Sequence, residues 1–341
     1  MNPKPVALIT GITGQDGSFL ADLLLAKGYE VHGVVRRNAV LFNRENLKHL
    51  HGSVPEERKI TLHYGDMTDS VSLANILANV KPDEVYNLAA QSHVQVSFET
   101  PLYTSLATGM GILNLLEAIR VLKLCPKIYQ ASTSELYSGN PKEAPQSEET
   151  PFHPRSPYGV AKLYASEIAR VYRESYGMFI AQGILFNHES ERRGENFVTR
   201  KITLGIRDIL LGTQKTITLG NLDAHRDWGY APEYVEAMWR MLQQKTPDDF
   251  VIATGETHSV EEFAEEACRL AKLEVKKVIT VAERYKRPNE VEYLCGNPAK
   301  AQRVLGWKAK TRFKDLVRIM VEKELAAVGH SLPFDQAHGK P

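Results

Sequence analysis

Short, continuously apolar runs alternate with amphipathic stretches through the first half of the chain. The apolar runs are rich in β-branched and aromatic residues, which predicts strands at 5–10, 29–35, 60–64, 84–89 and 127–131. Apolar positions at helical spacing predict helices at 17–27, 70–80, 104–122 and 157–176. Strands that are apolar along their whole length and alternate with helices indicate a parallel sheet covered on both faces.

The pattern changes after residue 186. Polar and glycine-containing loops there separate shorter helical stretches, such as 233–244 and 259–271. We therefore expect a first domain at 1–186 and a smaller α/β region at 187–328 that carries substrate contacts, with some segments returning to the main sheet. Residues 329–341 hold Gly, Ser, Pro and His without periodicity, which predicts a disordered tail.

Composition narrows the class of protein. The 341 residues are 43% apolar and 24% charged, and the formal net charge of +1 produces no bulk field that favours nucleic acid or an anionic membrane. No apolar run approaches the roughly 20 residues of a membrane span, and we see no signal peptide. Three scattered cysteines and eleven histidines without metal-binding spacing predict no disulfide and no metal site. We expect a cytoplasmic protein.

A glycine-rich turn follows the first predicted strand and opens the first predicted helix. The string Gly11-Ile-Thr-Gly-Gln-Asp-Gly17 allows a tight turn, a close approach of the backbone to a pyrophosphate, and a phosphate at a helix N-terminus. An ordinary turn is the alternative for the glycines alone. In the strand–turn–helix context, the string predicts a Rossmann-type doubly wound α/β fold that binds a dinucleotide.

The end of the second predicted strand bears on the choice of cofactor. NAD sites commonly place Asp or Glu there, whereas this strand ends in Arg36 and Arg37. Guanidinium groups suit the 2′-phosphate of NADP, although a solvated basic pair is the alternative interpretation. Asp66 is well placed to accept from the adenine amino group, and Leu88, Ala89 and Ala90 would put small residues against the cofactor.

Tyr158 and Lys162 open the predicted helix at 157–176 and share one face of it. A nearby ammonium favours phenolate, so we expect the pKa of Tyr158 to be lowered toward the neutral range, where the phenolate can act as a base. Thr133, Ser134 and Glu135 follow a predicted strand, at the edge of the sheet where ligands bind. Oxidation at one carbon needs only the tyrosine and a cofactor, whereas a carboxylate beside them adds the second proton-transfer group that a β-elimination requires. The alternatives are a surface Tyr–Lys pair and, for Glu135, a salt-bridged loop residue.

These residues resemble the extended short-chain dehydrogenases, and longer strings narrow the resemblance to the GDP-mannose 4,6-dehydratase family. The similarity runs from about residue 6 to about residue 325. Besides the glycine turn, it rests on Tyr86-Asn-Leu-Ala-Ala-Gln-Ser-His93, Gln130-Ala-Ser-Thr-Ser-Glu-Leu-Tyr137, Pro154-Arg-Ser-Pro-Tyr-Gly-Val-Ala-Lys-Leu-Tyr164, Gly183-Ile-Leu-Phe-Asn-His-Glu-Ser190, Phe197-Val-Thr-Arg-Lys201, Gly220-Asn-Leu-Asp-Ala-His-Arg-Asp-Trp-Gly229 and Arg287-Pro-Asn-Glu290.

The resemblance implies a reaction and a role for each catalytic residue. Tyr158 would deprotonate the sugar 4-hydroxyl while hydride passes from C4 to NADP, and Lys162 would orient the ribose. Glu135 would take the C5 proton and help to expel the 6-hydroxyl as water, with Thr133 and Ser134 in support. Hydride would then return to C6, so that there is no net redox change. The family also implies a GDP-sugar as substrate and a homodimer or homotetramer.

The resemblance also implies two sets of binding residues. The cofactor set is Gly11, Thr13, Gly14, Gln15, Asp16, Gly17, Arg36, Arg37, Asp66, Met67, Leu88, Ala89, Ala90, Ser92, Tyr103, Lys162, His188 and Arg193. The substrate set is Ser92, Asn187, Val198, Lys201, Gly220, Arg226, Arg287 and Glu290. Without the resemblance, Arg226 beside Asp227 would be interpreted as an ion pair and His188 as a satisfied core histidine.

Three stretches depart from the family pattern. Residues 38–44 replace a serine-rich stretch that reaches a neighbouring subunit's cofactor site, which puts the tetramer contacts in doubt. Ser138-Gly139 stands where Gly usually follows the tyrosine directly, and Glu191 stands where Pro is usual. The last two flank the predicted active site and could reshape it around C6.

Other functions remain open at this point. A 4,6-dehydratase of a GDP-linked heptose is the leading alternative, because nothing in the sequence sizes the pocket around C6. A nucleotide-sugar 4-epimerase or 4-reductase is a second class, and Glu135 argues against it. A non-catalytic NADP-binding regulator is a third class, but such proteins tend to lose Tyr158 or Lys162, and both are present.

Overall fold

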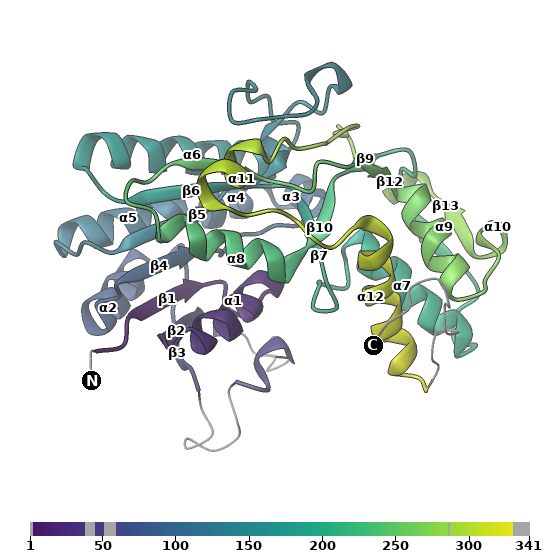
Figure 1. Ribbon diagram of the computed structural model, residues 1–341, viewed down its shortest axis with the longest axis horizontal. Coiled ribbons are helices and arrows are strands. Elements are labelled where there is room, and N and C mark those ends of the chain that lie inside the picture. The colour runs from purple at the N-terminus through teal and green to yellow at the C-terminus, as the bar shows by residue number, and fades with distance from the viewer. Residues whose placement is uncertain (1–2, 38–44, 51–58, 286, 330–341) are drawn as a thin grey trace.

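A computed structural model describes residues 3–37, 45–50, 59–285 and 287–329 (Figure 1). The departure at 38–44 and all but the first residue of the expected tail lie outside the described residues. The larger part of the molecule is a sheet between two layers of helices, and a smaller helical part lies beyond one end of that sheet (Figure 1).

The central sheet has seven parallel strands in the order β11-β6-β5-β4-β1-β2-β3. The strands are β1 (Val6–Thr10), β2 (Glu30–Val35), β3 (Thr61–Tyr64), β4 (Glu84–Asn87), β5 (Lys127–Ala131), β6 (Ile180–Leu185) and β11 (Asp249–Ile252). The order reverses at β1, which lies between β2 and β4. A crevice for ligands forms outside the carboxyl ends of strands at such a switch point.

Helices bury both faces of the sheet. They are α1 (Gln15–Ala26), α2 (Ser70–Val80), α3 (Val94–Glu99), α4 (Pro101–Thr104), the π-helix η3 (Ser105–Met110), α5 (Gly111–Val121), α6 (Pro157–Tyr176), α8 (Ala231–Leu242) and α11 (Ala299–Leu305). Ala7 and Ile9 of β1 join the core under α1, α8 and α11. Leu8 joins the core under α2, α5 and α6. The apolar character of every position in β1 follows from this burial on both sides.

The predicted fold class is confirmed, with shifts of a few residues at element ends. The helix expected at 104–122 begins earlier and is interrupted by η3, because the i,i+5 turn inserts an extra residue that periodicity does not reveal. The strands β6 and β11 were not among the predicted ones. Helix α8 begins at Ala231 rather than at 233, with Pro232 in its first turn.

The smaller part contains α7 (Val198–Leu210), α9 (Val260–Leu270), α10 (Val275–Val278), η6 (Glu283–Tyr285) and α12 (Phe313–Ala326). Its short strands are β7 (Asn187–Glu189), β8 (Ile217–Leu219), β9 (His225–Arg226), β10 (Trp228–Tyr230), β12 (His258–Ser259) and β13 (Ile279–Val281). They pair as β7–β10, β9–β12 and β8–β13. Helices α7, α9 and α12 pack around Trp228 and Phe263 in a core of their own.

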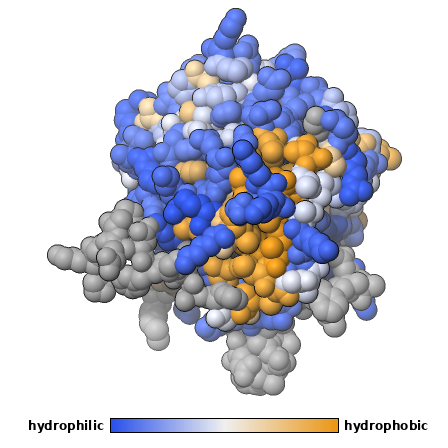
Figure 2. All heavy atoms as spheres, turned by 90° about the vertical axis from the view of Figure 1, so that its right-hand side faces the viewer, coloured by the Kyte–Doolittle hydropathy of each residue, from blue (hydrophilic) through white to orange (hydrophobic). Residues whose placement is uncertain are grey.

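The outer surface of the smaller part carries an apolar band between charged side chains (Figure 2). Leu211 and Val281, each 52% exposed, lie in the elements at this end of the molecule.

One helical stretch differs from the expectation about apolar length. Pro101–Val121 is long and apolar enough to cross a membrane by length and composition, although no such run was expected. Because 56% of its most apolar window is buried in the protein, it is accounted for as a core helix beside the sheet.

Candidate active site

The glycine turn lies at the carboxyl end of β1, at the switch point of the sheet. Gly11 has φ +71°, and a Cβ there would meet the backbone of Leu88 and Ala89 at 2.9 Å. A Cβ on Gly17 would lie 2.4 Å from the Gly11 carbonyl oxygen, so this glycine permits the helix to pack on the turn. A Cβ on Gly14 would meet only that oxygen, at 3.3 Å, and no side chain caps the first turn of α1. The turn therefore fits a pyrophosphate at Gly14.

The two glycines should respond differently to alanine. We expect Gly17→Ala to destabilise the protein by about 3 kcal/mol in urea unfolding, because the new methyl would overlap backbone atoms. Gly14→Ala, by contrast, should cost less than about 1 kcal/mol, since the conformation (φ −71°) suits alanine, and should instead weaken cofactor binding. Equal loss of stability in the two variants would contradict this assignment.

A chain of buried hydrogen bonds links the ends of β1, β4 and β5 below the crevice. The Thr10 hydroxyl donates to Asn87 Oδ1 (2.6 Å), and Asn87 Nδ2 donates to Gln130 Oε1 (2.7 Å). The amides of Leu88 and Ala89 donate to Thr10 Oγ1 at 3.2 Å. These bonds hold the predicted cofactor contacts at 88–90 in place, and our sequence reasoning had singled out neither Thr10 nor Asn87.

The Arg36 guanidinium donates to the hydroxyl of Tyr103. This contact brings together two predicted cofactor residues that are 67 positions apart. Arg36, Arg37 and Tyr103 are exposed, and Asp66 and Met67 begin the next βα loop. Asp66 Oδ1 accepts from the amide and the hydroxyl of Thr68 (2.9 and 2.8 Å), so it caps its own loop.

Tyr158 and Lys162 are both buried at the start of α6. Tyr158 is hydrogen-bonded to the hydroxyl of Thr133, and Glu135 contributes a nearby negative charge. Lys162 Nζ donates to the Ala131 carbonyl at 2.7 Å and lies 5.9 Å from the centre of the Tyr158 ring. The structure thus places Thr133 and Glu135 beside Tyr158 and Lys162, as the predicted catalytic group requires.

The expected lowering of the Tyr158 pKa is wrong for the protein without ligands. Burial raises the pKa of Tyr158 well above its usual value, and the hydrogen bond from Thr133 only partly opposes this. Burial also lowers the pKa of Lys162, to about 8. The two side chains share a helix face as predicted, but the ammonium is directed to a backbone carbonyl, so it does not offset the desolvation of the phenol.

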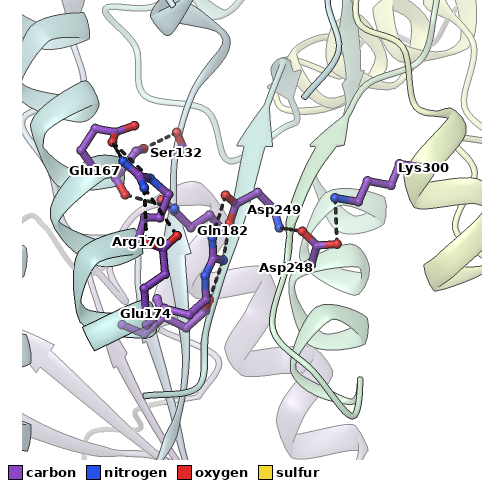
Figure 3. Close-up of polar contacts among 11 residues, drawn as sticks. Ser132, Glu167, Arg170, Glu174, Gln182, Asp248, Asp249 and Lys300 are labelled. Atoms are coloured by element: carbon purple, nitrogen blue, oxygen red, sulfur yellow. Dashed lines mark hydrogen bonds and ion pairs between the residues drawn. The ribbon is translucent and has the colours of Figure 1, made fainter. Parts of the chain in front are cut away.

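Helix α6 is tied to the sheet along its length (Figure 3). The Ser132 and Ser166 hydroxyls are 2.8 Å apart, and Gln182 Nε2 donates to the Ser166 carbonyl at 3.1 Å. Arg173 binds both carboxylate oxygens of Asp249 in β11, at 2.7 and 3.1 Å. These contacts fix the depth and rotation of the helix that carries the Tyr158–Lys162 pair.

Glu135 lies in the short 3-10 helix η4 (Ser134–Leu136), where its amide donates to Thr133 Oγ1 at 3.2 Å. One carboxylate oxygen is 3.3 Å from Arg287 Nη1, so the salt-bridge interpretation describes part of its environment. The other oxygen is buried and has no hydrogen-bond partner in the described part of the protein. A buried oxygen without a partner is costly unless a ligand meets it, which marks a site for substrate.

His188 and Asp16 form a half-buried pair beside the glycine turn. His188 Nε2 is 2.8 Å from Asp16 Oδ2, and Nδ1 is 2.8 Å from the Phe186 carbonyl oxygen. Burial alone would lower the pKa of His188, but the Asp16 carboxylate raises it above its usual value. Burial likewise opposes ionisation of Asp16, but His188 outweighs it and brings the pKa of that carboxyl to about 2. The Arg193 guanidinium lies 3.6 Å over the Phe197 ring and 3.1 Å from Glu189.

The remaining predicted substrate residues line two sides of the same region. Asn187 lies in β7, and Val198 and Lys201 lie in the first turn of α7, with Lys201 Nζ 3.8 Å over the Tyr285 ring. Gly220 is required by packing, because a Cβ there would lie 2.4 Å from the Tyr285 carbonyl oxygen. Ser92 is exposed in the loop after β4.

The ion pair between Arg226 and Asp227, considered above, does not form. Arg226 Nη2 donates to Glu290 Oε1 at 3.0 Å. Asp227, between β9 and β10, points to the opposite side and accepts from the amides of Thr254, Gly255 and Gly296 and from the Thr254 hydroxyl.

Two of the departures from the family pattern are described in the structure. Gly139 has φ +75°, and a Cβ there would lie 2.6 Å from Val291, while the Ser138 hydroxyl donates to Glu143 at 2.6 Å. The 138–139 turn therefore supports the loop that carries Arg287 and Glu290. Glu191 Oε2 accepts from the Tyr230 hydroxyl at 3.4 Å.

Solved structures with this architecture define the class of protein. A Thermus thermophilus UDP-glucose 4-epimerase, solved with NAD, is 27% identical, with a TM-score of 0.81 over 94% of this chain and 99% of that one. A Streptomyces venezuelae dTDP-glucose 4,6-dehydratase has a TM-score of 0.81 over 95% of this chain and 98% of that one, and at 20% identity it bears on the fold alone. The fold and the Tyr158–Lys162 pair define an extended short-chain dehydrogenase of the type that modifies nucleotide sugars.

Sequence comparison resolves the family within that class. The sequence profile of the GDP-mannose 4,6 dehydratase family matches residues 8–320. The chain is 53% identical to GDP-mannose 4,6 dehydratase 2 of Caenorhabditis elegans, over 95% of this chain and 90% of that protein. It is 51% identical to a GDP-mannose 4,6-dehydratase of Vibrio cholerae, over 99% of each. The chain belongs to the GDP-mannose 4,6-dehydratase family.

Proposed function

We propose that this protein converts GDP-D-mannose to GDP-4-keto-6-deoxy-D-mannose and water. The observation that carries this proposal is the buried carboxylate of Glu135 beside the Tyr158–Thr133 pair, with one oxygen left for a ligand. A 4-epimerase or 4-reductase needs no proton transfer at C5 or C6, so this group would have no use in those reactions. Family membership supports the same substrate.

The first step is removal of hydrogen from C4. NADP, held by the glycine turn, would supply the hydride acceptor and donor that the reaction needs, and the positive charge of its oxidised form would favour phenolate at Tyr158. Tyr158 takes the proton of the 4-hydroxyl, and the Thr133 hydroxyl stabilises the phenolate that this requires. Lys162, held on the Ala131 carbonyl, orients the ribose. The product of this step is a 4-ketone.

The second step is elimination across C5 and C6. The 4-ketone acidifies the proton on C5, and the Glu135 carboxylate accepts it. The same carboxyl then gives a proton to the 6-hydroxyl, which leaves as water. Hydride at C6 and a proton at C5 would then saturate the C5=C6 bond. Glu135, reprotonated from solvent, supplies that proton, and Tyr158 returns the proton of the 4-hydroxyl to solvent. The net change is the loss of one water, with no net redox change.

An isotope experiment tests the proposed function. GDP-mannose deuterated at C4 should give product with deuterium at C6, and reaction in heavy water should label C5, as mass spectrometry and proton NMR would show. The site must exclude water for this transfer to remain internal. Appearance of the C4 label in free NADPH would show a dehydrogenase instead.

The cofactor proposed is NADP rather than NAD. The glycine turn fits a nicotinamide dinucleotide, and Arg36 and Arg37 stand at the strand end where NAD sites carry a carboxylate. We expect calorimetry to show tighter binding of NADP(H) than of NAD(H), and Arg36→Gln to reduce that preference by about tenfold through loss of a charge-assisted bond. Equal affinity of the unmodified protein for the two cofactors would refute this choice.

We also propose that the protein is a homodimer or homotetramer. Helix α4 and the π-helix η3 pack on α6, and apolar side chains on these three elements remain exposed: Leu102, Leu106, Met110, Val160 and Tyr164. A second copy of the chain that covers them would remove this surface from water. Light scattering tests the assembly, and a monomer at micromolar concentration would contradict it.

A further inference from the structure

Four charged side chains from distant parts of the chain meet beside the catalytic tyrosine. Arg287 Nη1 lies 3.3 Å from Glu135 Oε1 and 3.1 Å from Glu290 Oε1. Arg226 Nη2 donates to the same Glu290 oxygen at 3.0 Å. One nitrogen of Arg287 thus bridges the predicted base Glu135 and the predicted substrate-binding residue Glu290. The cluster holds two guanidiniums and two carboxylates, so it is balanced in charge without a substrate.

The two guanidiniums differ in their freedom to move. Arg226 is 7% exposed in its side chain and is also held by the His225 carbonyl at 2.9 Å, and burial together with Arg287 lowers its pKa. Arg287 is 26% exposed and lies in residues 287–292, which form no helix or strand before the bridge at Tyr293. Of the two, Arg287 is therefore the guanidinium that can exchange partners at small cost.

The contact between Arg287 and Glu135 opposes the chemistry proposed for Glu135. The guanidinium holds one oxygen of the Glu135 carboxylate at 3.3 Å and ties it to Glu290, so the carboxylate is not free to turn toward the C5 proton. The same guanidinium is a fitting partner for a diphosphate, which it can bind in a bidentate manner. A diphosphate adds negative charge to a cluster that is already balanced, so it competes with the two carboxylates for Arg287.

We propose that Arg287 exchanges partners during substrate binding: it holds Glu135 in the free enzyme and moves onto the diphosphate of the nucleotide sugar, which releases Glu135 as the base. This inference rests on the function proposed above. It makes the nucleotide a condition for proton removal at C5, so that a hexose without a diphosphate leaves the base paired. Arg287 is then a positioning residue for Glu135 as well as a ligand of the substrate.

The exchange predicts an unusual result for a catalytic variant. Glu135→Gln should bind GDP about tenfold more tightly than the unmodified protein, because Arg287 no longer has to leave a carboxylate. GDP carries no hexose, so direct contact of residue 135 with the sugar does not enter the measurement. Calorimetric titration of the NADP-loaded protein gives the affinity independently of turnover.

Two comparisons separate partner exchange from a general change in charge. In the Arg287→Met background, which should itself bind GDP more weakly, Glu135→Gln should no longer increase the affinity. Glu292→Gln removes an exposed carboxylate from the same loop and should leave the affinity for GDP within about twofold, since exposed charges are screened by salt. Arg287→Gln is a second neutral variant if the methionine variant does not fold.

The outcomes that overturn the proposal are distinct from failure of the proposed function. An unchanged GDP affinity in Glu135→Gln, the same gain in the Arg287→Met background, or undiminished GDP binding by Arg287→Met each overturns the exchange. If UDP or dTDP binds and GDP does not, the proposed substrate is wrong, and the same set of variants titrated with that diphosphate still tests the exchange.

Discussion

Glu135→Gln is expected to lower the rate of dehydration by about 10³-fold, within the range usual for loss of a general acid–base group. Glutamine keeps the shape of the side chain but cannot accept the C5 proton. Tyr158 and Lys162 remain in place, so oxidation at C4 should continue. A single turnover should therefore accumulate reduced cofactor, visible by absorbance in the near ultraviolet.

The matched control for this variant is Glu292→Gln, which should dehydrate GDP-mannose at an undiminished rate. Substantial product from Glu135→Gln would remove Glu135 from its role. Loss of both steps, with no reduced cofactor, would instead mean that Glu135 acts on binding of the sugar or on Tyr158.

Tyr158→Phe should stop the reaction at the earlier step, oxidation at C4. We expect the rate of dehydration to fall by about 10²–10⁴-fold, with no accumulation of reduced cofactor. The hydroxyl that takes the C4 proton is removed, while the buried ring continues to fill its place in α6. Tyr176→Phe, at a 54% exposed position of the same helix, is the matched control and should retain activity. Absorbance from reduced cofactor in Tyr158→Phe would show that another group removes this proton.

Comparison of Glu135→Gln with Tyr158→Phe separates the two proton transfers of the reaction. Accumulated reduced cofactor in one and its absence in the other would order the two proton transfers in time. An identical phenotype would mean that Tyr158 and Glu135 act as a single unit and that their separate assignment is wrong.

Apolar patterning and short motifs predicted the parts of the fold and site that depend on residues close together in the sequence. Apolar runs marked β1 to β5 but not β6, which is buried inside the sheet, or the edge strand β11. The turn at Gly11 and Gly17 was recognisable because its backbone geometry requires glycine. Helical spacing placed Tyr158 and Lys162 on one face, but it carried no information on burial, and burial decides the pKa of Tyr158.

Such patterns could not predict contacts between residues that are far apart in the sequence. Arg287 and Glu135 are 152 residues apart, and they meet because the loop after η6 packs on the 138–139 turn. No periodicity connects the two positions. The pairing of Arg226 with Glu290 in preference to its neighbour Asp227 depends likewise on which face of a short strand is turned to that loop.

The route of the chain between the two parts of the molecule limits how the crevice can open. After β7 and β10 in the smaller part, the chain returns to the sheet as α8 and β11, leaves it for α9, returns as α11 and ends in α12 (Figure 1). Rotation of one body against the other has to bend all of these crossings together, whereas domains that share one linker turn about that linker alone. We therefore expect local loop movement rather than a large rotation to admit and release ligands. A fragment that ends at residue 186 would lack the edge strand β11 and the helices α8 and α11.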